Sequence, residues 1–127
     1  MFSAMSNIYE IPAELNQQEI FEKIISSKNL LIERIISAGQ TTPDGEWYDQ
    51  GTDEWVILLQ GKAEIAYFNG ERIELKSGDY LLLPAHTKHR VEFTSNEPPC
   101  IWLAVHGQLQ EATKQEATEQ KQLSKNN

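Results

Sequence analysis

Short apolar runs separated by turn residues fill the middle of the chain. Runs with the length and β-branched content of strands cover residues 30–38, 54–60, 62–68, 72–75, 80–83, 89–94 and 101–106. Asn69-Gly70 separates two of these runs and predicts a hairpin, because a type I′ turn needs a positive φ at both central residues. Thr42-Pro43-Asp44-Gly45 and Ser77-Gly78-Asp79 predict further turns. Strands at this spacing, with almost no helix among them, indicate an all-β sandwich or closed barrel.

The two ends of the chain differ from this middle region. Near the start, Asn16 can cap a helix and Glu19 stands three residues on, as in a capping box. An apolar stripe follows at Ile20, Phe21, Ile24 and Ile25. We therefore expect residues 1–29 to form an N-terminal strand and one α-helix packing on a barrel at residues 30–107. Residues 108–127 are a polar tail of Gln, Glu, Lys, Thr and Ala, expected to be a frayed helix or disordered.

Composition narrows the classes of partner. The formal net charge is −8, with 19 acidic residues against 11 Lys and Arg. Such a field repels phosphate backbones and anionic membranes, so neither nucleic acid nor a membrane is an expected partner. The first five residues hold no basic residue before an apolar block, which predicts a cytoplasmic protein without a secretory signal. Cys100 is the single cysteine, so no intrachain disulfide can form, and we expect it to be a small buried group.

Two segments carry a family resemblance. Glu54 and Gly61 are separated by six residues, as in the second half of the first cupin motif. Gly78, five residues, Pro84 and then His89 five positions later resemble the second cupin motif. The chain is similar to small single-domain, cupin-2-like proteins over about residues 30–107. The resemblance implies the cupin double-stranded β-helix, a jelly-roll barrel.

The sequence also departs from the family pattern. Metal-binding cupins generally place a His-x-His pair just before the Glu. Those places fall on Tyr48 and Gln50 here, or on Trp47 and Asp49 if the loop carries one more residue. In the second motif, His86 stands where Gly is usual and Phe93 where Asn is frequent. Of the usual four ligands, only Glu54 and His89 remain.

Strand periodicity suggests which side chains meet inside the barrel. Tyr48, Gln50 and Glu54 share one face of a continuous strand, and His89, Val91 and Phe93 share a face of another. His86 or His106 could then complete a two-His, one-carboxylate set with Glu54 and His89. Such a set suits one divalent ion of Fe, Zn, Mn or Ni. The candidate metal ligands are therefore Glu54, His86, His89 and His106, and the candidate substrate-binding residues are Trp47, Tyr48 and Gln50.

Two functions remain open from the sequence. One is a metal-assisted cupin enzyme of the isomerase or oxygenase type, acting on a small polar organic molecule. The other is a non-catalytic small-molecule-binding or sensor cupin without metal, in which Glu54 and His89 bond to polar neighbours. A phosphate on the ligand is disfavoured, because only Lys88 and Arg90 bring positive charge near the expected pocket. A homodimer that covers exposed strand edges is compatible with either function.

Overall fold

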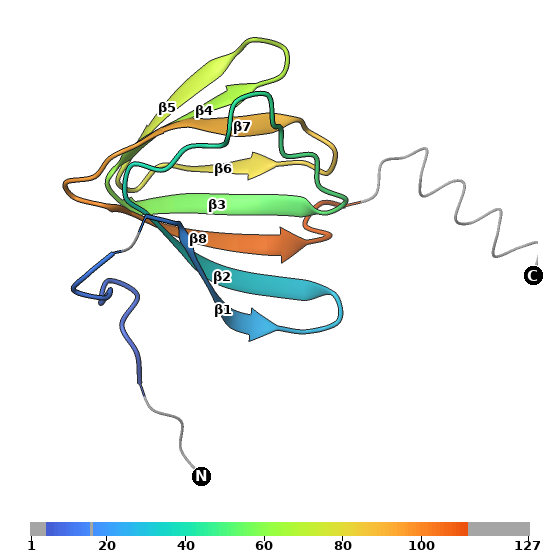
Figure 1. The fold of residues 1–127 in the computed structure, drawn as a ribbon. Helices are drawn as coiled ribbons and strands as arrows, with labels where there is room; N and C mark the ends of the chain where they lie inside the picture. Colours follow the sequence, from blue (N-terminus) through green and yellow to red (C-terminus); the bar gives the residue numbers. More distant parts are fainter. Residues whose placement is uncertain (1–4, 16, 112–127) are drawn as a thin grey trace, which may run out of the picture.

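The apolar runs form β-strands that pair in antiparallel fashion throughout (Figure 1). The computed structural model describes residues 5–15 and 17–111. Its strands are β1 (Ile20–Ser26), β2 (Leu30–Ser37), β3 (Asp53–Gln60), β4 (Lys62–Tyr67), β5 (Arg72–Lys76), β6 (Tyr80–Leu83), β7 (His89–Thr94) and β8 (Cys100–Gly107). A five-stranded sheet has the order β1-β2-β8-β3-β6, and a three-stranded sheet has the order β5-β4-β7. The predicted all-β cupin fold, a jelly-roll barrel, is confirmed.

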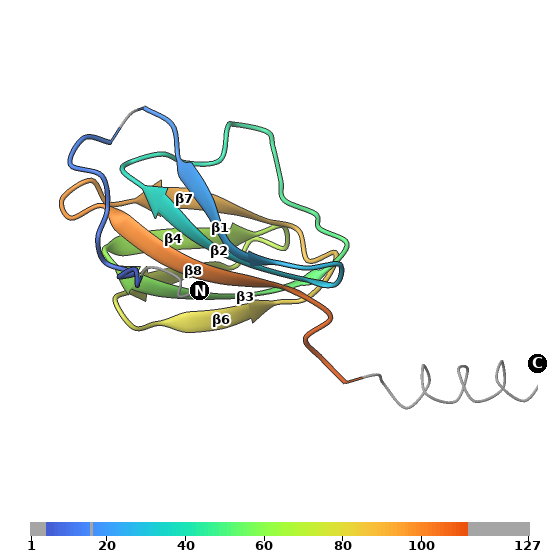
Figure 2. The same cartoon turned by 90° about the horizontal axis from the view of Figure 1, so that it is seen from below.

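The core lies between the two sheets, and Figure 2 shows β4 and β7 of the smaller sheet on one side of β8, β3 and β6 of the larger sheet. Alternate residues of each strand face inward, so apolar side chains of both sheets meet. Leu58 of β3 and Cys100 and Ala104 of β8 are fully buried, and Ile65 of β4 faces them from the smaller sheet. Between β3 and β4, Gly61 changes sheet in one residue with φ of 96°. A Cβ there would lie 2.9 Å from Cys100 Sγ, so only glycine fits this close approach.

The predicted N-terminal helix is wrong, because residues 20–26 form strand β1. Asn16, the predicted cap, lies outside the described residues. β1 pairs along β2 from Ile20 opposite Ile36 to Ser26 opposite Leu31. β2 would otherwise leave its backbone groups unpaired at the sheet edge, and β-branched and aromatic side chains suit a paired strand. Tertiary pairing therefore outweighs the local helix signal. The apolar stripe is not buried as a unit, since about half of each of three side chains is exposed: Phe21, Ile24 and Ile25.

The predicted inward face of β7 holds for only part of the strand. His89 is buried and Val91 is half-buried, but Phe93 is 51% exposed. β4 and β7 shift register between Glu64, which pairs with Phe93, and Ile65, which pairs with Val91. This bulge puts an extra residue in β7 and turns Phe93 to the outer face.

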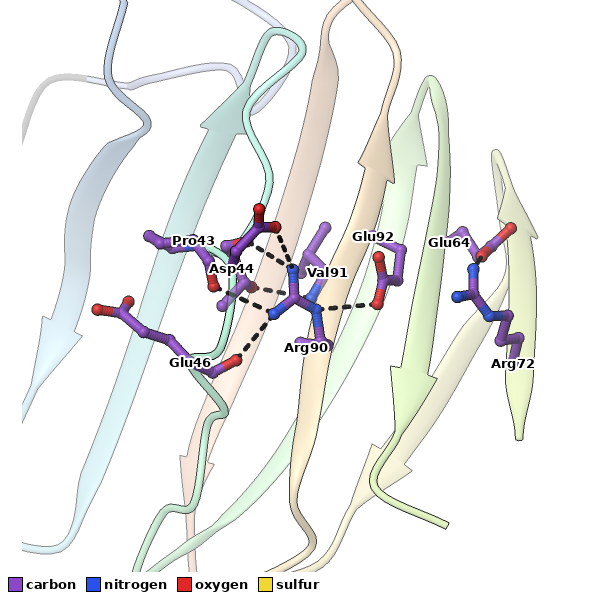
Figure 3. Close-up of polar contacts among 9 residues, drawn as sticks. Pro43, Asp44, Glu46, Glu64, Arg72, Arg90, Val91 and Glu92 are labelled. Atoms are coloured by element: carbon purple, nitrogen blue, oxygen red, sulfur yellow. Dashed lines mark hydrogen bonds and ion pairs between the residues drawn. The ribbon is translucent and has the colours of Figure 1, made fainter. Parts of the chain in front are cut away.

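The loop between β2 and β3 runs along the free edge of β7. Tyr48 and His89 exchange both backbone hydrogen bonds, at 2.8 and 3.1 Å, and Thr42 N donates to Val91 O at 3.0 Å. Arg90 fixes the same loop from the outer side of β7 (Figure 3). Its guanidinium donates to three loop carbonyls: Thr42 O at 2.8 Å, Pro43 O at 3.1 Å and Glu46 O at 3.1 Å. These bonds attach the loop to the smaller sheet along β7, its edge strand.

Within the described residues, no helix is long and apolar enough to cross a membrane.

The polar tail is predicted for residues 108–127, of which residues 112–127 lie outside the described residues. Asp53 anchors the described part, because its carboxylate accepts hydrogen bonds from Leu109 N at 2.9 Å and Gln110 Nε2 at 3.1 Å. These bonds and one from Ala85 N hold the pKa of Asp53 below its ordinary value.

Candidate functional site

A cavity of about 80 Å³ lies between the sheets at one end of the core. Glu54 of β3 and His106 of β8 are directly opposite each other in the β3–β8 ladder, so both face it. His89 reaches the cavity from β7, in the other sheet. Of the two histidines that the sequence offered beside Glu54 and His89, the structure brings His106 to the cavity.

The carboxylate of Glu54 stands between two imidazoles without touching either. Its Oε1 is 4.0 Å from His89 Nε2, and its Oε2 is 3.8 Å from His106 Nε2. Both distances are too long for a hydrogen bond. Glu54 is only 8% exposed, and the described residues give its carboxylate no hydrogen bond. Burial raises the pKa of Glu54, while attraction to His106 and His89 opposes the rise and Glu33 adds to it.

The hydrogen bonds of the two imidazoles define their free nitrogens. His89 Nδ1 lies 2.8 Å from Thr87 O, and a carbonyl oxygen only accepts, so we assign the proton to Nδ1. In the neutral ring, His89 Nε2 then presents a lone pair toward Glu54. His106 Nε2 lies 2.9 Å from Glu33 Oε1, so its proton is directed to Glu33 and not to Glu54. Within residues 5–15 and 17–111, neither the Glu54 carboxylate nor His89 Nε2 has a hydrogen-bond partner.

Two acidic residues of the cavity were missed from the sequence. Glu33 lies on β2 with its side chain turned inward, and Glu19 precedes β1 and accepts a hydrogen bond from Ser37 Oγ at 2.8 Å. Burial raises the pKa of Glu19, and the bond from Ser37 opposes this. Glu33 could have been found, because it is a charged residue at an inward position of a mostly apolar strand. Glu19 could not, because it was assigned to a helix.

The predicted ligand-binding residues Tyr48 and Gln50 both line the cavity. The Tyr48 ring stacks on the His89 ring with 5.4 Å between centroids. Burial raises the pKa of Tyr48, and nearby carboxylates, Glu19 first, raise it further. Gln50 stands at the entrance, where a surface groove of about 1000 Å³ adjoins the cavity. Glu33, Gln50 and His106 line both spaces, so the groove and the cavity adjoin at these three residues.

His86 and Trp47 lie away from the cavity. His86 is 73% exposed at its side chain, has a φ of 62° and places Nδ1 2.9 Å from Asp49 Oδ1. This left-handed backbone turns the ring toward the β2–β3 loop and away from Glu54. Trp47 packs edge-on against Phe68, with 5.1 Å between ring centroids. The structure thus gives neither residue the contact that the sequence interpretation expected.

The metal implied by the resemblance can be tested against the side chains present. Among the described residues, no group of three or more His, Cys, Asp and Glu side chains is arranged to hold a metal ion. The two oxygens of Glu54 face different imidazoles, and His106 Nε2 is already bonded to Glu33. Ligand atoms must converge to about 2.0–2.2 Å from one zinc-like ion. As placed, the donor set does not fit a metal, so we derive no chemical step through one.

Known proteins resemble this chain at different levels. A crystal structure described as a putative mannose-6-phosphate isomerase, from Ralstonia eutropha JMP134, is 39% identical, with a TM-score of 0.78, over 84% of this chain and 99% of that one. A cupin superfamily protein from Desulfitobacterium hafniense DCB-2 is 21% identical, with a TM-score of 0.64, over 77% of this chain and 84% of that one, and shows the fold alone.

A curated relative matches a shorter stretch. The RCS-specific HTH-type transcriptional activator RclR of Escherichia coli (strain K12) is 38% identical over 47 residues, which are 37% of this chain. The match spans only 16% of that relative's length. The family described as "Cupin domain" matches residues 34–106, which is more than half of the chain. With the fold and both motifs in place, the chain belongs to the cupin domain family.

Proposed function

We propose that this cupin binds a small polar organic molecule in the cavity between its sheets and moves a proton on it, in an isomerase-type reaction. The observation that supports the proposal is the Glu54 carboxylate, buried with no hydrogen bond from the described residues and 3.8–4.0 Å from two imidazoles. Neither Glu54 oxygen is among the fully buried atoms without a partner in the described residues, so both are reached from the cavity, where a ligand can take the place of water as hydrogen-bond donor. A ligand hydroxyl or amine between Glu54 and His89 can bond to both.

The same two groups are suited to acid–base chemistry. His89 Nε2 has a lone pair that can take a proton from a carbon beside a carbonyl group. Glu54 has a raised pKa, so in its protonated form it can give a proton to the carbonyl oxygen. His89 then returns its proton to the former carbonyl carbon, while a hydroxyl on the carbon that was deprotonated gives its proton to Glu54. The carbonyl group has moved by one carbon with no net change in atoms, and both side chains are restored. The 39% identical relative described as an isomerase supports this reaction type.

The size of the site sets the size of the ligand. The cavity of about 80 Å³ admits only a few non-hydrogen atoms, because one water molecule takes about 30 Å³ in the liquid. The adjoining groove has room for the rest of a small molecule. We therefore expect the reacting end to enter the cavity while the remainder lies in the groove.

The proposal is tested by proton exchange. The purified protein is screened against small polar carbonyl compounds and sugars by thermal shift, and each hit is incubated in D₂O and followed by proton NMR. We expect deuterium to enter the carbon next to the carbonyl, at a rate reduced at least tenfold in Glu54→Gln. His86→Ala is the matched control, because that imidazole lies outside the cavity, and its exchange rate should equal that of the wild type. Exchange unaffected by Glu54→Gln would refute the mechanism.

A non-catalytic sensor is the second candidate, favoured by the partial match to a transcriptional activator. In that case a hit binds in the cavity, Glu54→Gln weakens it, and no deuterium is incorporated. Elemental analysis of protein purified without chelators addresses the metal-assisted alternative separately. Stoichiometric Fe, Zn, Mn or Ni that is lost in His89→Ala would overturn the metal-free site proposed here. The expected cytoplasmic location also stays a prediction.

A further inference from the structure

The wall of the cavity changes from polar to apolar along its length. Glu54 and His106 stand at the end that adjoins the groove. Two inward-facing rows further along the larger sheet, Phe21 of β1, Ile35 of β2 and Trp102 of β8 lie opposite one another in the strand ladders, and all three line the cavity. Further aliphatic side chains of the wall are Val56, Ile65, Leu83 and Val91. A hydroxyl group placed against this part of the wall would lose its hydrogen bonds to water without replacement, which is costly.

The apolar row leads to an opening on the side of the barrel. Trp102 is buried, Ile35 is half-buried and Phe21 is 54% exposed, so the row runs from the core to the surface. Tyr48 lines the cavity from the β2–β3 loop and is exposed as well. Within residues 5–15 and 17–111, no backbone hydrogen bond joins that loop to β1. The cavity therefore reaches solvent between β1 and the loop, at Phe21 and Tyr48.

The side chains at this side opening favour an apolar occupant. In the part of the chain that the structure describes, the Phe21 ring contacts no other aromatic ring, and half of it lies in water. A ligand group that covers Phe21 and lies along Ile35 removes apolar surface from water, which favours binding in proportion to the area covered. Glu19 also lines the cavity, but its carboxylate already accepts a hydrogen bond from Ser37 Oγ at 2.8 Å. The side opening therefore suits an alkyl or aryl group better than a hydroxylated one.

We propose that the ligand is an α-hydroxy carbonyl compound with an alkyl or aryl arm that lies along the apolar row, and that Phe21 selects for this arm. This inference rests on the proposed function, since it names the substrate class of the same site. Glu54 and His89 bind the hydroxyl and carbonyl groups that the reaction needs, at the polar end of the cavity. A polar substituent on the other side of the reacting carbons lies in the groove. A polyhydroxylated sugar is disfavoured, because its chain would place hydroxyl groups against the apolar row.

Three uncharged probes that share one four-carbon α-hydroxy ketone skeleton test the inference. The ethyl ketone is 1-hydroxybutan-2-one, the trihydroxy ketone is 1,3,4-trihydroxybutan-2-one, and the phenyl ketone is 1-hydroxy-4-phenylbutan-2-one. Each is titrated into the full chain at pH 7, and binding is read from the imidazole signals of His89 and His106 in nitrogen–proton NMR spectra, with calorimetry for the affinity. We expect the ethyl ketone to bind at least tenfold more tightly than the trihydroxy ketone, and the phenyl ketone at least tenfold more tightly than the ethyl ketone.

Substitutions at Phe21 locate the effect. Phe21→Ala removes the ring and should weaken binding of the phenyl ketone at least fivefold, while the affinity for the ethyl ketone changes less than twofold. Phe93→Ala is the matched control, because Phe93 is about as exposed as Phe21 but lies on the outer face of β7, and it should leave both affinities unchanged. Phe21→Leu keeps an apolar side chain and should lose less than Phe21→Ala, and it serves as the test if alanine weakens the pairing of β1. Circular dichroism confirms that each variant is folded.

The outcomes separate this inference from the proposed function. A trihydroxy ketone that binds as tightly as the ethyl ketone, with both imidazole signals shifted, overturns the apolar arm and leaves the polar-ligand site standing. An affinity for the phenyl ketone that is unchanged in Phe21→Ala, or reduced equally in Phe93→Ala, also overturns the inference, because the arm then lies elsewhere. Binding in the expected order without entry of deuterium at the hydroxyl-bearing carbon supports the inference and refutes the isomerase reaction. If no ketone, and no hit of the thermal-shift screen, shifts the His89 and His106 signals, the site itself is refuted.

Discussion

Arg90 should contribute more to stability than its place on a strand surface suggests. Its side chain is 9% exposed and donates to Thr42 O, Pro43 O and Glu46 O (Figure 3). Its Nε also lies 2.9 Å from Glu92 Oε1, an ion pair that lacks the alignment of a hydrogen bond. We therefore predict that Arg90→Ala lowers the free energy of unfolding substantially.

The magnitude follows from which partners water can reach. The bond to Thr42 O is buried, and an orphaned buried acceptor costs about 1–3 kcal/mol. The other two carbonyls and Glu92 are partly exposed, so water replaces much of what they lose. Breaking a buried ion pair costs about 3–5 kcal/mol, which is an upper limit here because Glu92 is 25% exposed at its side chain. We expect a loss of about 3 kcal/mol for Arg90→Ala.

Urea unfolding followed by tryptophan fluorescence measures this loss. With a slope of about 2 kcal/mol/M, the midpoint should fall by about 1.5 M. Arg72→Ala is the matched control, because Arg72 pairs with Glu64 at 2.6 Å on the surface, with 61% of its side chain exposed. Its midpoint should not move beyond experimental error. Arg90→Lys should fall between the two, since it keeps the charge and loses the planar fork. Equal midpoint shifts in Arg90→Ala and Arg72→Ala would refute the argument.

Three further predictions use other parts of the fold. Gly61→Ala should lower the free energy of unfolding by about 3 kcal/mol, because alanine is strained at this positive φ and its Cβ would crowd Cys100. Gly39→Ala should lower it by about 1–2 kcal/mol, because Gly39 has a φ of 90° but nothing within 4 Å of a Cβ. Equal losses in urea unfolding would contradict the packing argument. Folding raises the pKa of Glu54 above 4.5, so the native state holds this proton more tightly than the unfolded state. The free energy of unfolding should therefore fall as the pH rises from 4.5 through the raised pKa. Glu54→Gln should lose part of this fall and be the more stable protein above that range, and parallel pH profiles of the variant and the wild type would exclude the effect. We also expect a homodimer that forms through the exposed edge of β1. Sedimentation velocity should show a dimer for the wild type and a monomer for Ile25→Lys. A monomeric wild type would contradict this expectation.

Much of the barrel could be predicted from local sequence. The run 89–94 became β7 with the same bounds, and the runs at 54–60 and 101–106 became β3 and β8 with one added residue at one or both ends. The turn at Asn69-Gly70 separates β4 from β5, with Gly70 at φ of 96°. These features are local, since alternation of apolar residues and turn chemistry act within a few residues. Periodicity also directed Glu54, Tyr48 and Gln50 inward, as found.

What the sequence could not decide depends on contacts distant along the chain. Residues 20–26 became a strand because β2, which follows them, has an edge to pair, and the same pairing brought Glu19 to the cavity. The bulge that turns Phe93 outward arises only where β7 meets β4. Whether His86 reaches Glu54 is set by a left-handed residue and by its bond to Asp49, 37 positions earlier. Local patterns determine which segments are strands and which faces of them are apolar. The pairing of strands decides which carboxylates and which histidines reach the cavity, because that pairing fixes which polar groups are buried together.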